Sequence, residues 1–514
     1  MLLDANDADR GVFARSFDAC VIGTGPAGIT VARRLAAKGL SVALMEGGGI
    51  DLESESQALY AGEIVGLEYY PLEDARLRMF GGSSMHWGGR CRELDAENFE
   101  SLPFETLRGW PIAKTDLDPY QAETDTILDL IPVTDVPDIP VVQDEARFHR
   151  IQYRYSPPTR FGEKYKDEIA ASQAIVCATN ANLVDLRLDD GLATVTGAVF
   201  KSFAPDDPGF TVSARLFVLC LGGIENPRAL LNCTSQIPVG IGNQNDVVGR
   251  YFCEHPHYRL GQVYYENPLP AAEVLGNPEE AYAPTKAFLE KHEVLSFSLL
   301  VTPTIEPPLS FGTELVRTAG CVTGFTERLA EGVLGKNLNC DRGGLGMYFA
   351  QDGEDHAVQA LIAVHSEQSL QRDSRIMLAD ETDAFGLRRI AFDWQLGEID
   401  LRTMQTAVLE LGAHYAEQGI GRVQAQDWLL GDTIDLPGMD SGHRVGGHHH
   451  MCATRMATDP REGVVDADCK VHGVSNLYIG GSSVFSSTGY ANPTYTIVQL
   501  ALRLGDHLNG LLRA

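Results

Sequence analysis

The sequence has no excess of basic residues and no long apolar segment. Its 514 residues contain 41 lysines and arginines against 70 aspartates and glutamates, a formal net charge of −29. A chain this acidic offers no basic stripe to neutralise nucleic-acid phosphates or an anionic membrane surface. No apolar run approaches the length that crosses a bilayer. We therefore expect no nucleic-acid partner and no membrane span.

Paired cysteines and a secretory leader are also missing. The 10 cysteines are scattered, without a CxxC or another paired spacing, which is typical of reduced, buried thiols. Residues 1–16 lack a basic region followed by an apolar core, and no twin-arginine pair precedes the first apolar strand. These features predict a cytoplasmic protein. The length allows two or three domains with a large core.

The most informative segment is residues 18–46, DACVIGTGPAGITVARRLAAKGLSVALME. A short apolar strand runs into Gly23, Gly25 and Gly28, a helix pattern follows, and a second strand ends on Glu46. This order of strand, glycine-rich turn, helix, strand and acidic residue is the dinucleotide-binding fingerprint in its required context. The segment therefore predicts a dinucleotide site.

Each part of the fingerprint has a physical role. Gly23 makes the tight turn, Gly25 lets the backbone approach a pyrophosphate, and Gly28 lets the helix pack on the sheet. The N-terminus of the helix offers free N–H groups and a positive dipole end to the phosphates. Glu46 is suited to bind ribose hydroxyls.

Strand–glycine–helix units recur in the middle and at the end of the chain. An apolar strand within residues 215–231 ends in Gly222 and Gly223, and residues 476–508 contain a strand that ends in Gly480 and Gly481 before a helix that begins at Pro493. These units converge if one nucleotide-binding domain is assembled from separated segments. We expect that domain to comprise residues 15–110, 170–258 and 441–514.

The remaining residues, 111–169 and 259–440, are expected to form the substrate-binding domain and connecting segments. Three strand-like runs suggest an antiparallel sheet there: VLSFSLLVTP (294–303), GLGMYFAQ (344–351) and LRRIAFDWQL (387–396). The predicted class is α/β, α+β overall: a Rossmann-like domain of discontinuous segments with a second domain built on an antiparallel sheet.

Four motifs resemble those of the glucose–methanol–choline (GMC) oxidoreductases, an FAD-dependent family that oxidises alcohols. They are GGSSMHWGG (81–89), VGRYFCEHP (248–256), HHMCATRM (449–456) and GGSSVFSSTGYANPT (480–494), in the order and spacing of the family. The resemblance covers nearly the whole chain. It is strongest to the branch of pyranose oxidase and the bacterial sugar and glycoside dehydrogenases, which has a catalytic His–Asn pair.

The resemblance assigns His449 and Asn492 as catalytic residues. Oxidation by a flavin needs a group that accepts the hydroxyl proton and a route for hydride to flavin N5; a neutral imidazole suits the first task. Asn492 would hydrogen-bond the substrate oxygen. A purely structural role stays open for Asn492, because Asn followed by Pro is also a good pair for the N-cap and first residue of a helix. We expect no metal at the histidine run 448–450, because neighbouring residues point apart and no cysteine or carboxylate has ligand spacing.

The GGSSMHWGG loop is expected to lie against the flavin. His86 aligns with a histidine that carries FAD covalently in pyranose oxidase, but Met85 departs from that pattern and we expect non-covalent FAD. Cys452 and Ala453 replace the usual Gly and Thr beside the base, which leaves the substrate open. The predicted FAD-binding residues are Gly23, Gly25, Pro26, Ala27, Gly28, Glu46, Gly47, Gly81, Gly82, Ser83, His86, Gly481, Ser482, Asn492, Pro493 and Thr494.

The resemblance implies oxidation of a secondary hydroxyl of a sugar, glycoside or cyclitol-like alcohol to a ketone. Oxidation of another alcohol, an FAD-containing lyase on the same fold and a non-catalytic FAD-binding subunit stay open as alternatives. The electron acceptor is also open between O2, a quinone and a small redox protein. So is the assembly state, whether a homo-oligomer or a complex with a small accessory subunit.

Overall fold

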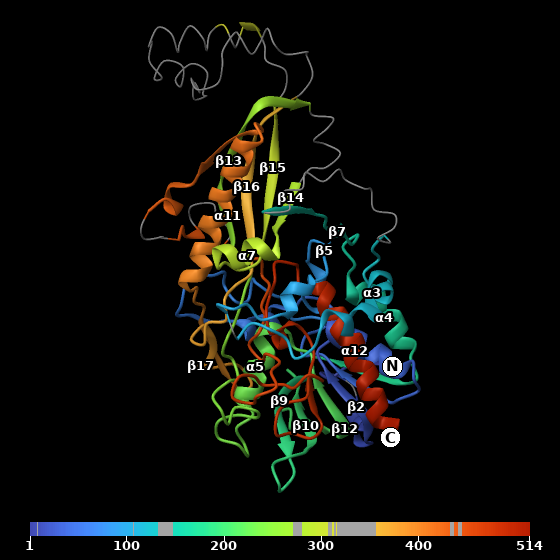
Figure 1. Ribbon diagram of the computed structural model, residues 1–514. Coiled ribbons are helices and arrows are strands. Elements are labelled where there is room, and N and C mark those ends of the chain that lie inside the picture. Colours follow the sequence, from blue (N-terminus) through green and yellow to red (C-terminus); the bar gives the residue numbers. More distant parts are fainter. Residues whose placement is uncertain are drawn as a thin grey trace.

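The computed structural model describes residues 1–7, 9–105, 107–131, 147–270, 280–306, 311–312, 315, 356–431, 436–439 and 445–513. Two six-stranded sheets dominate it, one in the lower half and one in the upper half of Figure 1. The lower sheet is parallel throughout. Its strands, in spatial order, are β1 (Leu2–Asp4), β8 (Ile175–Thr179), β3 (Val42–Met45), β2 (Phe17–Ile22), β12 (Ala214–Leu219) and β20 (Leu477–Ile479).

The parallel sheet confirms that one domain is built from separated segments. The strands β2, β12 and β20 are neighbours, although they come from the start, middle and end of the chain. Every residue of β3, β8 and β20 is buried, which explains why their sequences are continuous apolar runs rather than alternating ones. The domain limits given above remain a prediction.

Three helices follow the glycine turns at the ends of these strands. They are α1 (Pro26–Ala36), α5 (Gly222–Asn232) and α12 (Thr494–Arg513). α12 begins one residue later than expected and packs on α1. Because all three strands run parallel, all three helices begin at the same edge of the sheet.

The upper sheet is antiparallel and confirms the second part of the predicted fold. The long helix α11 (Glu398–Glu417) lies beside it in Figure 1 and contacts β19, β16, β13 and β15. Its strands, in spatial order, are β19 (Gly421–Ala425), β13 (His257–Pro270), β16 (His356–Ser366), β15 (Phe297–Glu306), β14 (Glu280–Pro284) and β6 (Phe148–Ile151).

Two of the three strand-like runs expected in this sheet need comment. The run 294–303 overlaps β15, whereas 344–351 lies outside the described residues. The run 387–396 forms β18 (Arg388–Asp393), but β18 pairs with β17 (Arg375–Thr382) and β4 (Gly62–Ile64) in a separate three-stranded sheet. Apolar alternation indicates a strand without naming its partner, so that assignment was wrong.

Smaller elements complete the described fold. They are the sheet of β11 (Phe210–Val212), β10 (Val195–Lys201) and β9 (Asn182–Leu188), the pair β5 (Arg90–Cys91) and β7 (Arg154–Tyr155), and the helices α2 (Ser54–Gln57), α3 (Gln121–Ile127), α4 (Phe161–Ala171) and α7 (Lys286–His292). The eight cysteines within the described ranges are free thiols, and all are buried. Among the described residues, no helix is both long and apolar enough to cross a bilayer.

Candidate active site

A cavity of about 580 Å³ opens at the carboxyl edge of the parallel sheet. Its wall combines the first glycine turn, the loop that contains His86, the start of α5, the histidine loop 447–450 and the segment 492–494. This is where ligands bind in open parallel sheets, because the loops after neighbouring strands diverge there.

The cavity is suited to an anionic cofactor. The N-termini of α1, α5 and α12 all contribute to its wall, and each presents unpaired backbone N–H groups and a positive dipole end. Three arginines, Arg76, Arg78 and Arg90, also line it. Two acidic residues, Glu46 and Asp74, line it as well, so the three arginines outnumber the carboxylates in the cavity wall.

The glycines of the fingerprint fit FAD in three different ways. A side chain at Gly25 would meet no protein atom within 4 Å and would point into open space. Gly23 has a φ of +107°, which favours glycine. A Cβ on Gly28 would lie 1.9 Å from the carbonyl oxygen of Gly23, so Gly28 allows the helix to pack on the turn. Of these three glycines, only Gly25 faces open space that a ligand can occupy.

Most of the predicted cofactor residues line the cavity, and a few lie behind it. Gly28, Gly47 and Gly81 are not part of the wall; they allow close packing against Gly23, Arg78 and Gly162 respectively. The predicted residues that do line the cavity are Gly23, Gly25, Pro26, Ala27, Glu46, Gly82, Ser83, His86, Gly481, Ser482, Asn492, Pro493 and Thr494.

Glu46 is already engaged by the protein. Its carboxylate accepts hydrogen bonds from the backbone N–H and hydroxyl of Thr24, at 2.9 and 2.5 Å, and from the N–H of Gly48 at 2.9 Å. A carboxylate has about four lone-pair sites, so one remains for a ribose hydroxyl. The first role of Glu46 is to hold the glycine turn on the end of β3.

Sequence reasoning missed several cavity residues. Thr24, Tyr60, the three arginines and the start of α5 line the wall without having been predicted to bind. The pair Arg76 and Arg78 immediately before the Gly-rich loop was an available signal, since arginines next to a flexible loop often bind phosphate.

The histidine loop is held by one buried carboxylate. Glu254 is fully buried, and it accepts hydrogen bonds from the backbone N–H groups of His255 at 2.8 Å, Gly447 at 3.2 Å and His449 at 2.7 Å. The hydroxyl of Tyr69 donates a further short bond to it. Burial raises the pKa of Glu254 to about 7, and these donors oppose that rise.

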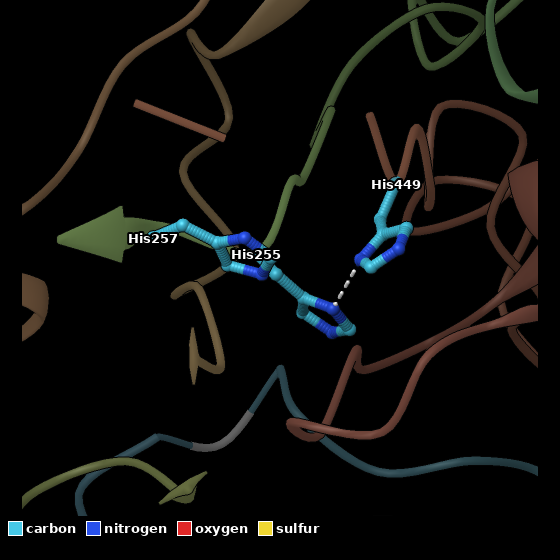
Figure 2. A group of neighbouring side chains, drawn as sticks. All are labelled: His255, His257 and His449. Carbon is cyan, nitrogen blue, oxygen red and sulfur yellow. Dashed lines mark hydrogen bonds between the residues drawn. The ribbon is translucent and has the colours of Figure 1, made fainter. Parts of the chain in front are cut away.

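This carboxylate brings His255 and His449 together, as Figure 2 shows. Their Nδ1 atoms are 2.9 Å apart, and His449 Nε2 lies 3.1 Å from the Nδ2 of Asn492. At the other end, His255 Nε2 lies 3.3 Å from the carbonyl oxygen of Thr488. The catalytic pair predicted from sequence therefore meets in the structure, and His255 joins it.

The hydrogen bonds that link Thr488, His255, His449 and Asn492 determine the tautomers of the two histidines. The carbonyl of Thr488 can only accept, so His255 carries its proton on Nε2 and accepts at Nδ1. His449 therefore donates from Nδ1, which leaves the lone pair of its Nε2 toward Asn492 and the cavity. This is the tautomer that a general base at the cavity wall requires.

Asn492 does not cap the helix that follows it. Its Nδ2 is directed to His449, and its Oδ1 is buried without a hydrogen-bond partner. The N-cap interpretation of the Asn–Pro pair was therefore wrong, because the side chain is turned toward the cavity rather than back to the helix. A buried, unpaired acceptor at the wall is suited to a ligand N–H or O–H.

Both histidines are neutral at ordinary pH. Burial lowers the pKa of His255 to about 4. Burial and then the neighbouring imidazoles, His255 first among them, hold the pKa of His449 well below 6.5. His86, also on the cavity wall, has its pKa lowered by burial and by Arg160. Its non-covalent contact with FAD remains a prediction.

Sequence comparisons identify relatives that oxidise hydroxyl compounds. Residues 371–501 match the family model described as GMC oxidoreductase. The chain is 23% identical over 558 residues to 2-methyl-1,2-propanediol dehydrogenase of Mycolicibacterium austroafricanum, with 96% of this chain and 95% of that protein covered. It is 24% identical over 563 residues to 6'''-hydroxyparomomycin C oxidase of Streptomyces lividus, with 96% and 92% covered.

Solved structures with a similar fold have distant sequences. Pyridoxine 4-oxidase from Mesorbium loti superposes with a TM-score of 0.54 at 15% identity, covering 96% of this chain and 99% of that one. An FAD-dependent oxidoreductase from Chaetomium thermophilum superposes with a TM-score of 0.56 at 13% identity, covering 97% and 100%. These similarities extend across both sheets.

Adding one methyl group at Gly25 or at Gly28 should have different consequences. We expect Gly25→Ala to fold normally but to purify with little or no FAD, because its methyl enters only the ligand space. Gly28→Ala should lose stability instead, because its methyl meets the carbonyl of Gly23. Flavin absorbance per chain and the melting temperature of the apoprotein check both. A Gly25→Ala protein with full FAD content would contradict the assigned cofactor position.

The lowered pKa of His449 predicts a shifted pH profile. An ordinary imidazole would be half protonated at about pH 6.5 and half of the base would be lost. Burial keeps His449 neutral below that pH. The rate constant of flavin reduction should therefore stay constant as the pH falls, until the pH is well under about 6.5. Stopped-flow reduction between pH 5 and 9 measures this. Glu254, whose pKa is raised to about 7, also titrates in this range, and Glu254→Gln removes that titration. A loss of rate near pH 6.5 that persists in Glu254→Gln would contradict the assignment of His449 as the base.

Proposed function

The chain belongs to the GMC oxidoreductase family, and from that premise we propose that it oxidises a secondary hydroxyl of a sugar, glycoside or cyclitol-like alcohol to a ketone. Its cofactor is FAD. The observation that carries the proposal is the neutral His449, whose Nε2 lone pair faces Asn492 at the cavity wall.

The protein residues supply the proton transfer and the positioning. The residues of the cavity wall would hold FAD, which would supply the hydride-accepting chemistry. His449 Nε2 takes the hydroxyl proton, and its imidazolium is then stabilised by the Nδ1 bond to His255. Asn492 Nδ2 is placed to donate a hydrogen bond to the substrate oxygen, as well as to His449. This arrangement orients the carbinol C–H bond while the proton leaves.

The names of the relatives support a hydroxylated substrate but not the carbon oxidised, because 2-methyl-1,2-propanediol can transfer hydride only from its primary carbon. One relative is named for a diol and another for an aminoglycoside; fructose dehydrogenase large subunit of Gluconobacter japonicus is 23% identical over 306 residues.

An anaerobic screen for bleaching of the flavin tests the proposal. We expect sugars, glycosides or cyclitols to reduce the flavin and a ketone to appear as product. As a probe for oxidation at a primary carbon we choose 2-methyl-1,2-propanediol, because its tertiary carbon has no hydrogen to transfer. Reduction by primary alcohols alone would contradict oxidation at a secondary hydroxyl. A lyase would turn over without bleaching, and a non-catalytic subunit would show neither.

The catalytic pair predicts graded losses. His449→Ala should slow flavin reduction by roughly 10²- to 10⁴-fold, the usual cost of losing a general base. Asn492→Ala should slow it by about 10- to 100-fold, as expected for one hydrogen bond to the reacting oxygen. Both variants should keep their FAD, measured by absorbance, so that the loss is kinetic.

The histidine His472 provides a control outside the cavity, where its Nε2 lies 2.9 Å from the carbonyl oxygen of Ala457. His472→Ala should reduce its flavin at the rate of the unmodified protein. If His449→Ala also kept that rate, His449 would not be the base.

A further inference from the structure

Three imidazoles from two segments converge beside the cavity. His255 and His257 precede and begin the strand β13, and His449 comes from the loop after residue 445. One ring nitrogen from each lies within 4.8 Å of the other two, and Figure 2 shows the three rings. This group differs from the histidine run 448–450: the ring of His448 packs on Tyr70, whereas His449 faces His255.

His255 and His257 are two residues apart in the segment His255–Pro256–His257, and only His257 belongs to β13. Because a residue before proline favours extended backbone, this spacing is suited to placing both side chains on one side. His449 reaches them because Met451 and Cys253 pair through two backbone hydrogen bonds of 2.9 and 3.1 Å. The fold thus brings the histidines at the start of β13 next to a third histidine on a neighbouring segment.

Two of the rings pack closely on Gly447. A Cβ built on Gly447 would lie 2.7 Å from His449 Nδ1 and 2.9 Å from His257 Nε2, so the absence of a side chain at this position lets both nitrogens approach the same backbone segment. The ring of His257 is stacked on His365, with centroids 3.6 Å apart. This stacking orients His257 before any ligand arrives, which reduces the ordering cost of binding.

We propose that His255, His257 and His449 form a binding site for a borderline divalent cation such as Zn²⁺, and that its occupation inhibits the enzyme. Three imidazoles are a donor set that zinc prefers, with water as the usual fourth ligand, whereas Mg²⁺ and Ca²⁺ prefer oxygen ligands. In a tetrahedral site the nitrogens are about 3.4 Å apart. Small χ rotations of the half-buried His257 and His449 bring the three into that range.

Inhibition follows from the proton balance at His449. In the metal-free protein, the Nδ1 proton of His449 is shared with His255 and Nε2 is the base. A cation bound between the two Nδ1 atoms takes both lone pairs, so the proton of His449 moves to Nε2 and no proton is released. Nε2 then cannot accept the substrate proton. The unpaired Oδ1 of Asn492 can turn to accept from the new N–H. This consequence, unlike the binding itself, rests on the proposed function.

The test measures metal binding and flavin reduction separately on untagged holoenzyme. Calorimetric titration with ZnCl₂ should give one site per chain, and Zn²⁺ should slow flavin reduction with the same affinity, reversibly with EDTA. His257→Phe keeps a ring to stack on His365 and should weaken zinc binding at least about tenfold. His257→Gln serves as a second variant if Phe disturbs β13, and melting temperature and FAD content check folding.

The matched control is His448, an exposed member of the same histidine run whose ring packs on Tyr70 with centroids 4.2 Å apart. His448→Ala should bind zinc as the unmodified protein does. Absence of zinc binding, or equal affinity in both His257 variants, would overturn the site. Zinc that binds at this site without slowing flavin reduction would leave the site intact and contradict His449 as the base.

Discussion

The active-site architecture depends on the buried carboxylate of Glu254. A buried acidic side chain is costly unless its oxygens are hydrogen-bonded, and the donors here are the backbone N–H groups of His255, Gly447 and His449. By satisfying that one carboxylate, two segments nearly 200 residues apart are held side by side. The contact between the two imidazoles follows from this constraint, and so does the exposure of His449 Nε2 to the cavity.

The parallel sheet supplies the other half of the site. Its strands β2, β12 and β20 end at one edge, where three helix N-termini and three arginines gather around a single cavity. Positive potential at that edge is suited to the phosphates of FAD. The histidine loop passes close to the start of α5, where a Cβ on Gly223 would lie 2.1 Å from the carbonyl oxygen of His450. The histidine loop, with the proposed base His449, is thus positioned against the domain of the parallel sheet.

Local features of the site could be predicted from the sequence, and long-range ones could not. Strand, glycine and helix are neighbours in the chain, so the turns at Gly23, Gly222 and Gly480 are readable as patterns. The hydrogen bond between His255 and His449 joins residues 194 positions apart, and no local sequence pattern predicts it. Likewise Asn–Pro before a helix favours an N-cap, and only the tertiary structure turns Asn492 toward His449. The strand β18 was recognised, but its partners were not, because pairing is decided by packing.

The central claim is that the protein holds His449 neutral, with its proton on Nδ1 and its Nε2 free to act as base. Nitrogen NMR of ¹⁵N-histidine-labelled holoenzyme at neutral pH observes this directly, with the signals of His449 identified by their loss in His449→Gln. The account predicts a protonated Nδ1 and an unprotonated Nε2 for His449. A protonated Nε2, or an imidazolium with both nitrogens protonated, would contradict it.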